Sequence, residues 1–481
     1  MSKKTLLSGL FTDFYELTMA QGYFHAGRST ENATFDYFFR TNPFNGGFLI
    51  FAGLDDFLES LGDFHFSENG LHFLQKCGLN ADFLNYLSTF KFGGKIYSVP
   101  EGSIVFPGEP LVRVEGNIIE SQLIETLLLN TINFESLIAT KAFRIKLSLG
   151  KRPFVDFGLR RAQGLGGIQA TRAAIIGGAS STSNLLAAQK YELPVSGTMA
   201  HSWVQSFTSE LEAFEEYAKI NPDNTILLID TYDTLNSGLP NAVKVGQRLK
   251  ASGNKLKGVR LDSGDLAVLS KAVRCRLDQE GLEKVKIVVS NQLNEYVIKK
   301  LLEQDAPIDA FGVGTELMTG KPDAALDGVY KLTECNGEAK MKFSDDRAKQ
   351  TLPGTKRLYR FCDKDGSFCC DGIYLADESP DKSDKNSLKL YKLDPPNKEL
   401  NLEDLAHENL AYENLDYHEL QQLVYAGGKI LIKQNNPLDI HQFLLTQAAK
   451  LDPKYKRIVN PQTYNVGISP KLSALSRKLQ P

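Results

Sequence analysis

Between residues 150 and 330 the chain repeats one pattern, in which a short apolar segment rich in β-branched residues precedes a longer segment of helical periodicity. The apolar segments lie at 152–158, 224–234, 256–265, 285–291 and 308–318. Strands that alternate with helices at this spacing predict right-handed βαβ crossovers and a parallel sheet. The region can therefore fold as a parallel barrel or as an open α/β sheet.

Polar residues gather where these apolar segments stop. They are Asp156 and Arg160, residues 196–201, Asp230 and Asp233, Arg260 and Asp262, Ser290 and Asn291, and Gly312 and Gly314. The carboxyl ends of parallel strands converge on one face, where ligands bind in barrels and in open sheets. His201, in the sequence "SGTMAHSW", is therefore predicted at the rim of an active site. The alternative is a hydrogen-bonded packing histidine at a strand end.

Two of these strand ends carry groups suited to a phosphorylated sugar. The stretch "RLDSGD", residues 260–265, combines a guanidinium with two carboxylates, which can hold a pyrophosphate with its Mg²⁺ and a ribose diol. A buried Arg–Asp pair is the structural alternative. The stretch "FGVGTE", residues 311–316, offers backbone N–H groups to a phosphate after the last strand. Glu316 is expected to point away, because an anion beside a phosphate would repel it.

Composition excludes several function classes. The net charge is −3 and charges of both signs are interspersed, which argues against nucleic-acid binding. No apolar run reaches the length of a membrane span, and residues 1–16 do not resemble a signal peptide, so a cytoplasmic location is expected. Six cysteines in 481 residues do not form a disulfide framework. Cys362, Cys369 and Cys370 lack the paired spacing of a zinc site and are predicted to be reduced thiols.

Several motifs resemble the nicotinate phosphoribosyltransferase family. They include "FTDFYELTMAQGYF", "VDFGLRRAQG", "GGASSTSN", "SGTMAHSW", "LLIDTYDT", "VRLDSGD" and "FGVGTELMTGKPDAALDGVYKL", in order from about residue 8 to 360. The resemblance implies a type II phosphoribosyltransferase fold, an irregular TIM-like α/β barrel with an α/β sandwich domain. Residues 1–130 and 351–481 would form the sandwich, and residues 131–350 the barrel. A charged, proline-containing segment at 377–401 is expected to be an exposed loop.

The resemblance also implies an activity. Members form nicotinate mononucleotide and pyrophosphate from nicotinate and phosphoribosyl pyrophosphate, coupled to ATP hydrolysis, in NAD salvage. Mg²⁺ would arrive with the two phosphorylated substrates rather than at a dedicated protein site. A homodimer with active sites at the interface is implied, with no nucleic-acid or membrane partner. Nicotinamide phosphoribosyltransferase and a catalytically silent sugar-phosphate-binding barrel remain alternatives.

Residue roles follow from the matched motifs. His201 would be transiently phosphorylated by ATP, Arg260 would hold phosphoribosyl pyrophosphate, and Asp262 would hold its ribose or metal. Further substrate contacts are expected from Asp230, Asn291, Gly312, Gly314, Thr315 and, from the partner subunit, Arg40. Lys349 or Lys356 would serve the ATP phosphates, with a solvated loop as the alternative for this segment. Gln292 replaces an aspartate expected in the family.

The base site is implied in the same way. Tyr15 and Phe157 would stack on the pyridine ring, with Arg160 nearby. Ser180 or Ser181 would donate to the nicotinate carboxylate, where the nicotinamide-specific family carries an aspartate. The same serines fit an ordinary helix N-cap, which also attracts anions.

Overall fold

The computed structural model describes residues 8–343, 350–383, 388–393, 399–400 and 415–480. The chain divides into two compact units. Unit 1 comprises residues 1–140, 325–435 and 439–481, and unit 2 comprises residues 141–324 and 436–438. None of the described helices is both long enough and apolar enough to cross a membrane.

Unit 2 contains the repeated strand–helix pattern. Its elements are β6 (Phe154–Asp156), α8 (Gly166–Ile176), β7 (Ser181–Thr182), α9 (Leu185–Tyr191), α10 (His201–Gln205), α11 (Glu210–Ile220), β8 (Thr225–Leu228), α12 (Leu239–Ala251), β9 (Leu256–Leu261), α13 (Leu266–Gln279), β10 (Lys286–Val289), α14 (Glu295–Glu303), β11 (Ala310–Val313) and α15 (Thr315–Met318). All paired strands of its six-stranded sheet are parallel, as the pattern predicts.

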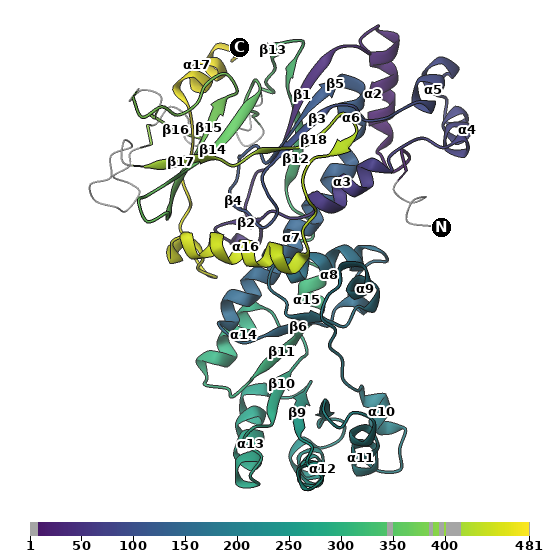
Figure 1. Ribbon diagram of the computed structural model, residues 1–481, viewed down its shortest axis with the longest axis vertical. Helices are drawn as coiled ribbons and strands as arrows, with labels where there is room; N and C mark the ends of the chain where they lie inside the picture. Colours follow the sequence, from purple (N-terminus) through teal and green to yellow (C-terminus); the bar gives the residue numbers. More distant parts are fainter. Residues whose placement is uncertain (1–7, 344–349, 384–387, 394–398, 401–414, 481) are drawn as a thin grey trace. The chain divides into compact units, whose positions relative to one another are not determined.

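The strand order of this sheet is β7-β6-β11-β10-β9-β8. Except for β7 and β8, consecutive strands lie side by side, and the last strand, β11, returns to the first, β6, as in the cyclic order of a barrel. In the described residues β7 and β8 are not paired with each other, so the sheet is a curled half-barrel (Figure 1). The predicted barrel-like α/β fold is confirmed in this open form.

Unit 1 carries two main sheets. Its helices are α2 (Phe14–His25), α3 (Leu54–Gly62), α4 (Glu68–Lys76), α5 (Ala81–Ser88), α6 (Ile118–Leu123), the first part of α7 (Glu125–Leu149), α16 (Pro437–Lys450) and α17 (Pro470–Lys478). Its strands are β1 (Asn32–Phe39), β2 (Leu49–Ile50), β3 (Lys95–Ser98), β4 (Ile104–Val105), β5 (Val112–Asn117), β12 (Gly328–Cys335), β13 (Glu338–Ala339), β14 (Lys356–Cys362), β15 (Phe368–Leu375), β16 (Tyr391–Lys392), β17 (Asp416–Glu419), β18 (Gln422–Ala426), β19 (Lys429–Ile430) and β20 (Val466–Ile468).

Both sheets of unit 1 join segments distant in sequence. One has the order β13-β12-β1-β5-β3-β18-β19, and the other has the order β16-β20-β15-β14-β17 (Figure 1). N-terminal and C-terminal segments therefore build this unit together, as expected. One boundary differs: β12 falls inside the predicted barrel range 131–350 but pairs antiparallel with β1 in unit 1. Only Tyr330, Thr333 and Cys335 of its eight residues are buried, which fits that sheet and not a helix-covered parallel strand.

The cysteine cluster lies in the core of the second sheet. Cys369 and Cys370 pack with Leu388, Leu390 and other buried apolar residues. Burial raises the pKa of Cys369 to about 12, so its thiol stays protonated at neutral pH. The segment 377–401 is thus not wholly exposed, because Leu388 and Leu390 are buried in this core.

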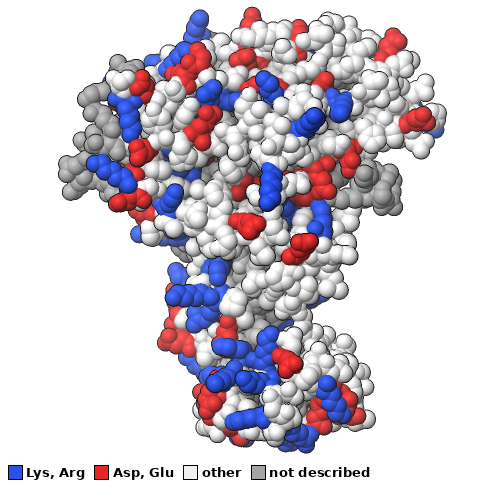
Figure 2. Space-filling view, viewed as in Figure 1, with Lys and Arg blue, Asp and Glu red and all other residues white. Residues whose placement is uncertain are grey.

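Figure 2 shows acidic and basic side chains interspersed over the face in view. This distribution is in keeping with the small net charge.

Candidate active site

The polar residues that follow β6, β8, β9, β10 and β11 lie along one edge of the sheet, because neighbouring strands are parallel and in register. Arg260 in β9, for example, pairs with Leu228 in β8 and with Val288 in β10. Backbone bonds continue past the strands, from the N–H of Ile229 to the carbonyl of Arg260 and from that of Ser290 to the carbonyl of Leu261. The strand ends are therefore held in fixed positions, which suits a preorganised site.

Arg260 is the centre of the site. Its Nε donates to Ser290 Oγ at 2.9 Å, its Nη1 to Thr198 Oγ1 at 3.0 Å, and its Nη2 to Asp262 Oδ1 at 3.3 Å. The Ser290 hydroxyl in turn donates to Asp262 Oδ1. The side chain of Arg260 is 12% exposed and that of Asp262 is 27% exposed. The pair is thus fixed in direction and still accessible to a ligand.

Asp230 holds the neighbouring strand end. Its Oδ2 accepts from the Asp262 N–H at 2.7 Å and from Ser263 Oγ at 2.7 Å. Its Oδ1 is buried and has no hydrogen-bond partner among the described residues. An acceptor in that position is available to a sugar hydroxyl or to a metal ion.

The other aspartates of these motifs have different roles. Asp265 caps α13, with its Oδ1 accepting from the N–H groups of Ala267 and Val268 at 3.1 Å. Asp233 caps the turn after β8 in the same manner. Of the two carboxylates in "RLDSGD", only Asp262 therefore faces Arg260, because Asp265 is occupied as an N-cap.

His201 is the first residue of α10. Its Nδ1 lies 3.1 Å from Thr231 Oγ1, and its Nε2 lies 4.0 Å from Asp262 Oδ2. The side chain is 41% exposed, so it is not a buried packing histidine. Trp203 Nε1 donates to the Ala213 carbonyl at 3.0 Å and fixes α10 against α11. A Nδ1–H that donates to Thr231 leaves the Nε2 lone pair free beside Asp262.

These oxygens fit magnesium only together with substrate. Carboxylate oxygens such as those of Asp230 and Asp262 are ligands that Mg²⁺ accepts. Within the described ranges, no group of three or more His, Cys, Asp and Glu side chains is arranged to hold a metal ion. A magnesium ion at this edge would therefore take most of its ligands from phosphate and water.

Comparisons with known proteins place this arrangement in a family. The nicotinate phosphoribosyltransferase family model matches residues 153–390, and the models of the N-terminal and C-terminal domains match residues 10–133 and 355–476. A nicotinate phosphoribosyltransferase of Bacillus subtilis is 40% identical over 471 residues, which is 96% of this chain and 92% of that protein. The chain belongs to the nicotinate phosphoribosyltransferase family.

Two further relatives agree with this assignment. Nicotinate phosphoribosyltransferase pncB2 of Mycobacterium tuberculosis is 45% identical over 377 residues, covering 78% of this chain and 80% of that protein. The crystal structure of human nicotinic acid phosphoribosyltransferase superposes with a TM-score of 0.84 at 29% identity, covering 98% of this chain and all of that one.

Phe157 directly follows β6 at this edge of the sheet. The Arg260 guanidinium carbon is 5.5 Å from the centroid of its ring. A Cβ on Gly312 would come within 2.4 Å of the same ring, so a residue without a Cβ is needed there to leave room for Phe157. Arg160 is exposed in the following turn and donates to the Phe157 carbonyl at 3.3 Å. The structure thus brings Phe157, Arg160 and Arg260 to one region.

Neither Ser180 nor Ser181 of "GGASSTSN" caps a helix. Ser181 is in β7, and the cap of the following helix α9 is Asn184, whose side chain accepts from the Ala187 N–H. Ser180 Oγ donates to the Phe154 carbonyl at 2.8 Å. The N-cap interpretation is therefore wrong for both serines, and donation from Ser180 to a carboxylate requires its hydroxyl to turn away from Phe154.

Buried Asp156 holds this region together. It accepts from Thr171 Oγ1 at 2.9 Å, from Thr182 Oγ1 at 2.7 Å and from the Gly158 N–H at 2.8 Å. Burial raises the pKa of its carboxyl, and these hydrogen bonds oppose the shift. Asp156 therefore joins β6 to β7 instead of facing a ligand.

The loop after β10 contains two residues with left-handed backbones, and the loop after β11 contains Gly314. Asn291 and Gln292 have φ values of 85° and 44°, so both are left-handed, a conformation that asparagine tolerates better than glutamine. Gly314 precedes α15, which begins at Thr315. Glu316 lies 3.7 Å from Lys321 Nζ. The phosphate roles of Asn291, Gly312, Gly314 and Thr315 stay predictions.

The remaining predicted residues lie in unit 1 or outside the described part. Tyr15 is 47% exposed on α2, and Arg40 follows β1 and pairs with Asp327 at 3.3 Å. Lys349 lies outside the described residues. Lys356 is 2% exposed and pairs with Asp36 Oδ2 at 2.9 Å, and its contact with ATP phosphates stays a prediction.

Sequence reasoning placed Thr198 and Ser290 at strand ends but gave them no role, and it missed Thr231. Thr231, Thr198 and the hydroxyl of Ser290 contact His201 and Arg260 directly. Each follows or precedes a predicted strand, but a threonine or serine at a strand end is common. Only the register of neighbouring strands indicates which of them faces a charged partner.

Proposed function

We propose that this protein forms nicotinate mononucleotide and pyrophosphate from nicotinate and phosphoribosyl pyrophosphate, in the synthesis of NAD. The observation that carries the proposal is the accessible cluster of Arg260, Asp262 and His201 at the strand ends of a chain in this family. Arg260 and Asp262 belong to one hydrogen-bonded network, and His201 Nε2 lies 4.0 Å from Asp262 Oδ2. Such a set can bind a pyrophosphate, a ribose and a transferable phosphate.

The sugar chemistry needs positioning more than a general base. The nicotinate ring nitrogen attacks C1 of the ribose, the C1–O bond to pyrophosphate breaks, and the transition state resembles an oxocarbenium ion. Arg260 would bind the departing pyrophosphate, and Asp230 Oδ1 and Asp262 would hold the ribose hydroxyls or a substrate-bound Mg²⁺. Mg²⁺ neutralises the developing charge on the leaving group when it is bound.

His201 would couple ATP hydrolysis to this transfer. Because Nδ1 faces Thr231, Nε2 is the nitrogen that would attack the terminal phosphorus of ATP, releasing ADP and leaving a phosphohistidine. Water would later hydrolyse the P–N bond. The added charge beside the pyrophosphate site can shift substrate affinity. We place this reaction in the cytoplasm.

The base site would be completed in a homodimer. Tyr15 and Arg40, from unit 1 of the partner subunit, would add the second aromatic face and a further pyrophosphate contact. Exposure of the Tyr15 ring supports a role toward a ligand or a partner. Mixed dimers of His201→Ala and Tyr15→Ala chains test this, because each dimer then holds one site with both native residues. Activity above that of either parent supports shared sites, and no recovery contradicts them.

The first experiment measures mononucleotide formation from nicotinate or nicotinamide, with and without ATP. Nicotinate turnover stimulated by ATP is expected, and His201→Ala should lose the stimulation. His72→Ala, an exposed histidine of α4, is the matched control and should keep it. Product from nicotinamide alone would instead favour the nicotinamide-specific activity. Binding of sugar phosphate without turnover would favour a silent barrel.

A further inference from the structure

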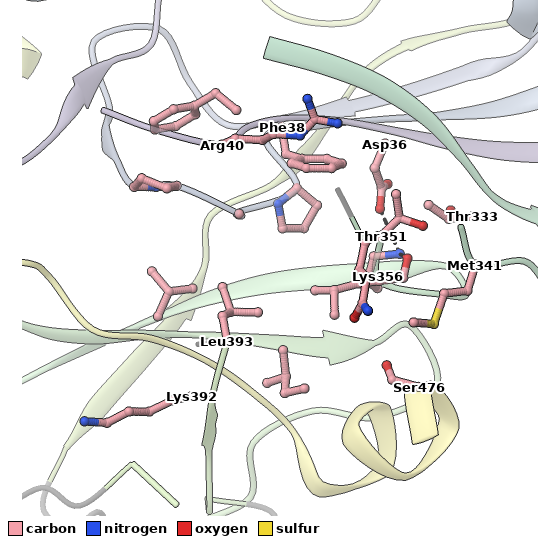
Figure 3. A pocket seen from close by; sticks show the side chains of 18 of the residues that line it. Asp36, Phe38, Arg40, Thr333, Met341, Thr351, Lys356, Lys392, Leu393 and Ser476 are labelled. Atoms are coloured by element: carbon pink, nitrogen blue, oxygen red, sulfur yellow. Dashed lines mark hydrogen bonds and ion pairs between the residues drawn. The ribbon is translucent and has the colours of Figure 1, made fainter. Parts of the chain in front are cut away.

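A large cavity lies within unit 1, whose residues alone line it. Its volume is about 580 Å³, in the range of small-molecule sites. It is lined by β1, β12, β14, β16, β20, α17 and the connecting loops (Figure 3). The apolar part of the lining consists of Phe38, Phe39, Pro107, Pro110, Met341, Leu352, Leu393, Val466 and Ile468.

One end of the cavity presents a buried carboxylate. Asp36 and Phe38 are two residues apart on β1 and therefore share a face of the sheet. Asp36 is 1% exposed, and its Oδ2 pairs with Lys356 at 2.9 Å (Figure 3). Its Oδ1 accepts no hydrogen bond from any residue in the described part of the chain.

Lys356 cannot satisfy that second oxygen. Its ammonium donates to the carbonyls of Leu352 at 2.9 Å and Gly354 at 2.5 Å, and its ion pair with Asp36 is made to Oδ2, so none of these contacts reaches Oδ1. The Asp36–Lys356 pair has no net charge. What it offers the cavity is one unused acceptor, which favours a neutral N–H or O–H donor.

A second polar point lies on α17. The hydroxyl of Ser476 lines the cavity, is buried, and has no hydrogen-bond partner among the described residues. A buried polar atom that lacks a partner is costly, so both positions favour a ligand that hydrogen-bonds to them. The apolar walls favour a ligand that is otherwise hydrophobic.

Anions are disfavoured at the Asp36 end. A carboxylate there would face the Asp36 Oδ1 lone pairs. Arg40 also lines the cavity; its guanidinium pairs with Asp327 at 3.3 Å through Nη1, and its buried Nε has no hydrogen-bond partner among the described residues. A neutral amide avoids the repulsion and supplies the missing donor.

We infer that this cavity is a binding site for neutral, mostly apolar molecules that carry an amide or similar N–H donor, bound with the donor at Asp36. Binding there does not depend on phosphoribosyl transfer, although Arg40, a proposed pyrophosphate contact, also lines the cavity.

The test compares three probes of one shape on the full-length protein by titration calorimetry. They are 4-phenylbenzamide, which has the donor, biphenyl-4-carboxylate, which is an anion, and 4-acetylbiphenyl, which has neither charge nor donor. The amide is expected to bind at least tenfold more tightly than the other two. Equal affinities, tighter binding of the carboxylate, or no binding of the amide would overturn the inference.

Two variants of α17 test whether the amide binds in this cavity. Ser476→Leu fills part of the cavity and should weaken amide binding at least tenfold. Ala474→Leu adds the same side chain to the exposed face of the same helix and should leave it unchanged. A cooperative thermal unfolding transition in both variants shows that they fold. Undiminished amide binding in Ser476→Leu would place the probe elsewhere and overturn the assignment.

Discussion

Two Arg–Asp pairs in this protein have the same chemistry and different surroundings. Arg260 and Asp262 lie at the edge of the half-barrel, 3.3 Å apart, with side chains 12% and 27% exposed. Arg360 and Asp371 lie on neighbouring strands β14 and β15 of unit 1, 2.6 Å apart and fully buried. The first pair is accessible and shares its donors with neutral hydroxyls. The second is bidentate and sealed in a core, where its role is structural.

The difference shows how position decides the use of an ion pair. At the carboxyl ends of parallel strands, side chains face solvent and converge on a ligand. Between two packed layers, the same charges are desolvated and must neutralise each other. Removing Arg360 should therefore mainly lower stability, and removing Arg260 should mainly lower activity.

The largest expected effect on stability comes from Arg360→Met. It leaves Asp371 buried without its partner, next to Glu109, whose carboxyl pKa burial already raises well above its usual range. We expect a loss of about 3–5 kcal/mol. Hydrogen exchange of the β14 and β15 amides measures it locally, and Trp203, the only tryptophan, reports on unit 2 separately.

The double variant Arg360→Met/Asp371→Leu is the control for this prediction. Removing both charges together should recover most of the lost stability. If the single variant exchanges no faster than the native protein, the buried pair is not a structural element and the comparison fails.

Arg260→Met should act on turnover instead. Without the guanidinium the pyrophosphate loses its main cation, and kcat/KM for phosphoribosyl pyrophosphate should fall by about 10²–10³-fold. Stability should change by no more than about 1 kcal/mol, because the site is accessible to water. Arg276→Met, an exposed arginine on α13, is the matched control and should keep native kinetics. If Arg260→Met destabilises the fold while the molecules that remain folded keep the native kcat/KM, Arg260 is structural and the comparison is contradicted.

Ser290→Ala tests whether the Ser290 hydroxyl positions the accessible pair. The hydroxyl bridges Arg260 and Asp262, and its loss frees the guanidinium to rotate. We expect kcat/KM to fall about tenfold, or about 1.4 kcal/mol. Steady-state kinetics at varied phosphoribosyl pyrophosphate concentration measure this. Ser252→Ala, which removes a hydroxyl at the end of α12, should have no effect. Identical kinetics in both variants would mean that Ser290 does not position the pair.

The smallest effect is a pH dependence from unit 1. Burial raises the pKa of Glu16, beside Tyr15, to about 7 from 4.5. The folded state then binds the proton more tightly than the unfolded state, so this group stabilises the fold fully below about pH 4.5. The contribution is lost as the pH rises toward 7, and it is on the order of 1 kcal/mol after solvent screening. Thermal unfolding midpoints of the native protein and Glu16→Gln between pH 5 and 8 measure it. Parallel curves for the two proteins would contradict the shift.

Periodicity was enough to predict the parallel sheet and the edge on which the candidate site lies. The alternation of apolar strands and helical segments fixes strand direction, and parallel strands end on the same side. The motifs also indicated His201, Arg260 and Asp262, since each directly follows or ends an apolar segment. The residue types in "RLDSGD" did not show that Asp262 faces Arg260 while Asp265 caps a helix, because capping depends on where the backbone turns.

The sequence by itself therefore determined the type of fold, the family and the chemistry of the strand-end residues, all of which depend on local patterns and motif order. Only the tertiary structure decided that β12 joins β1, that Lys356 is buried against Asp36, and that Thr231 and Ser290 orient the charged groups. These contacts join residues about 30 to 320 positions apart. Which residues meet at such separations depends on strand register and sheet packing, to which no local pattern responds.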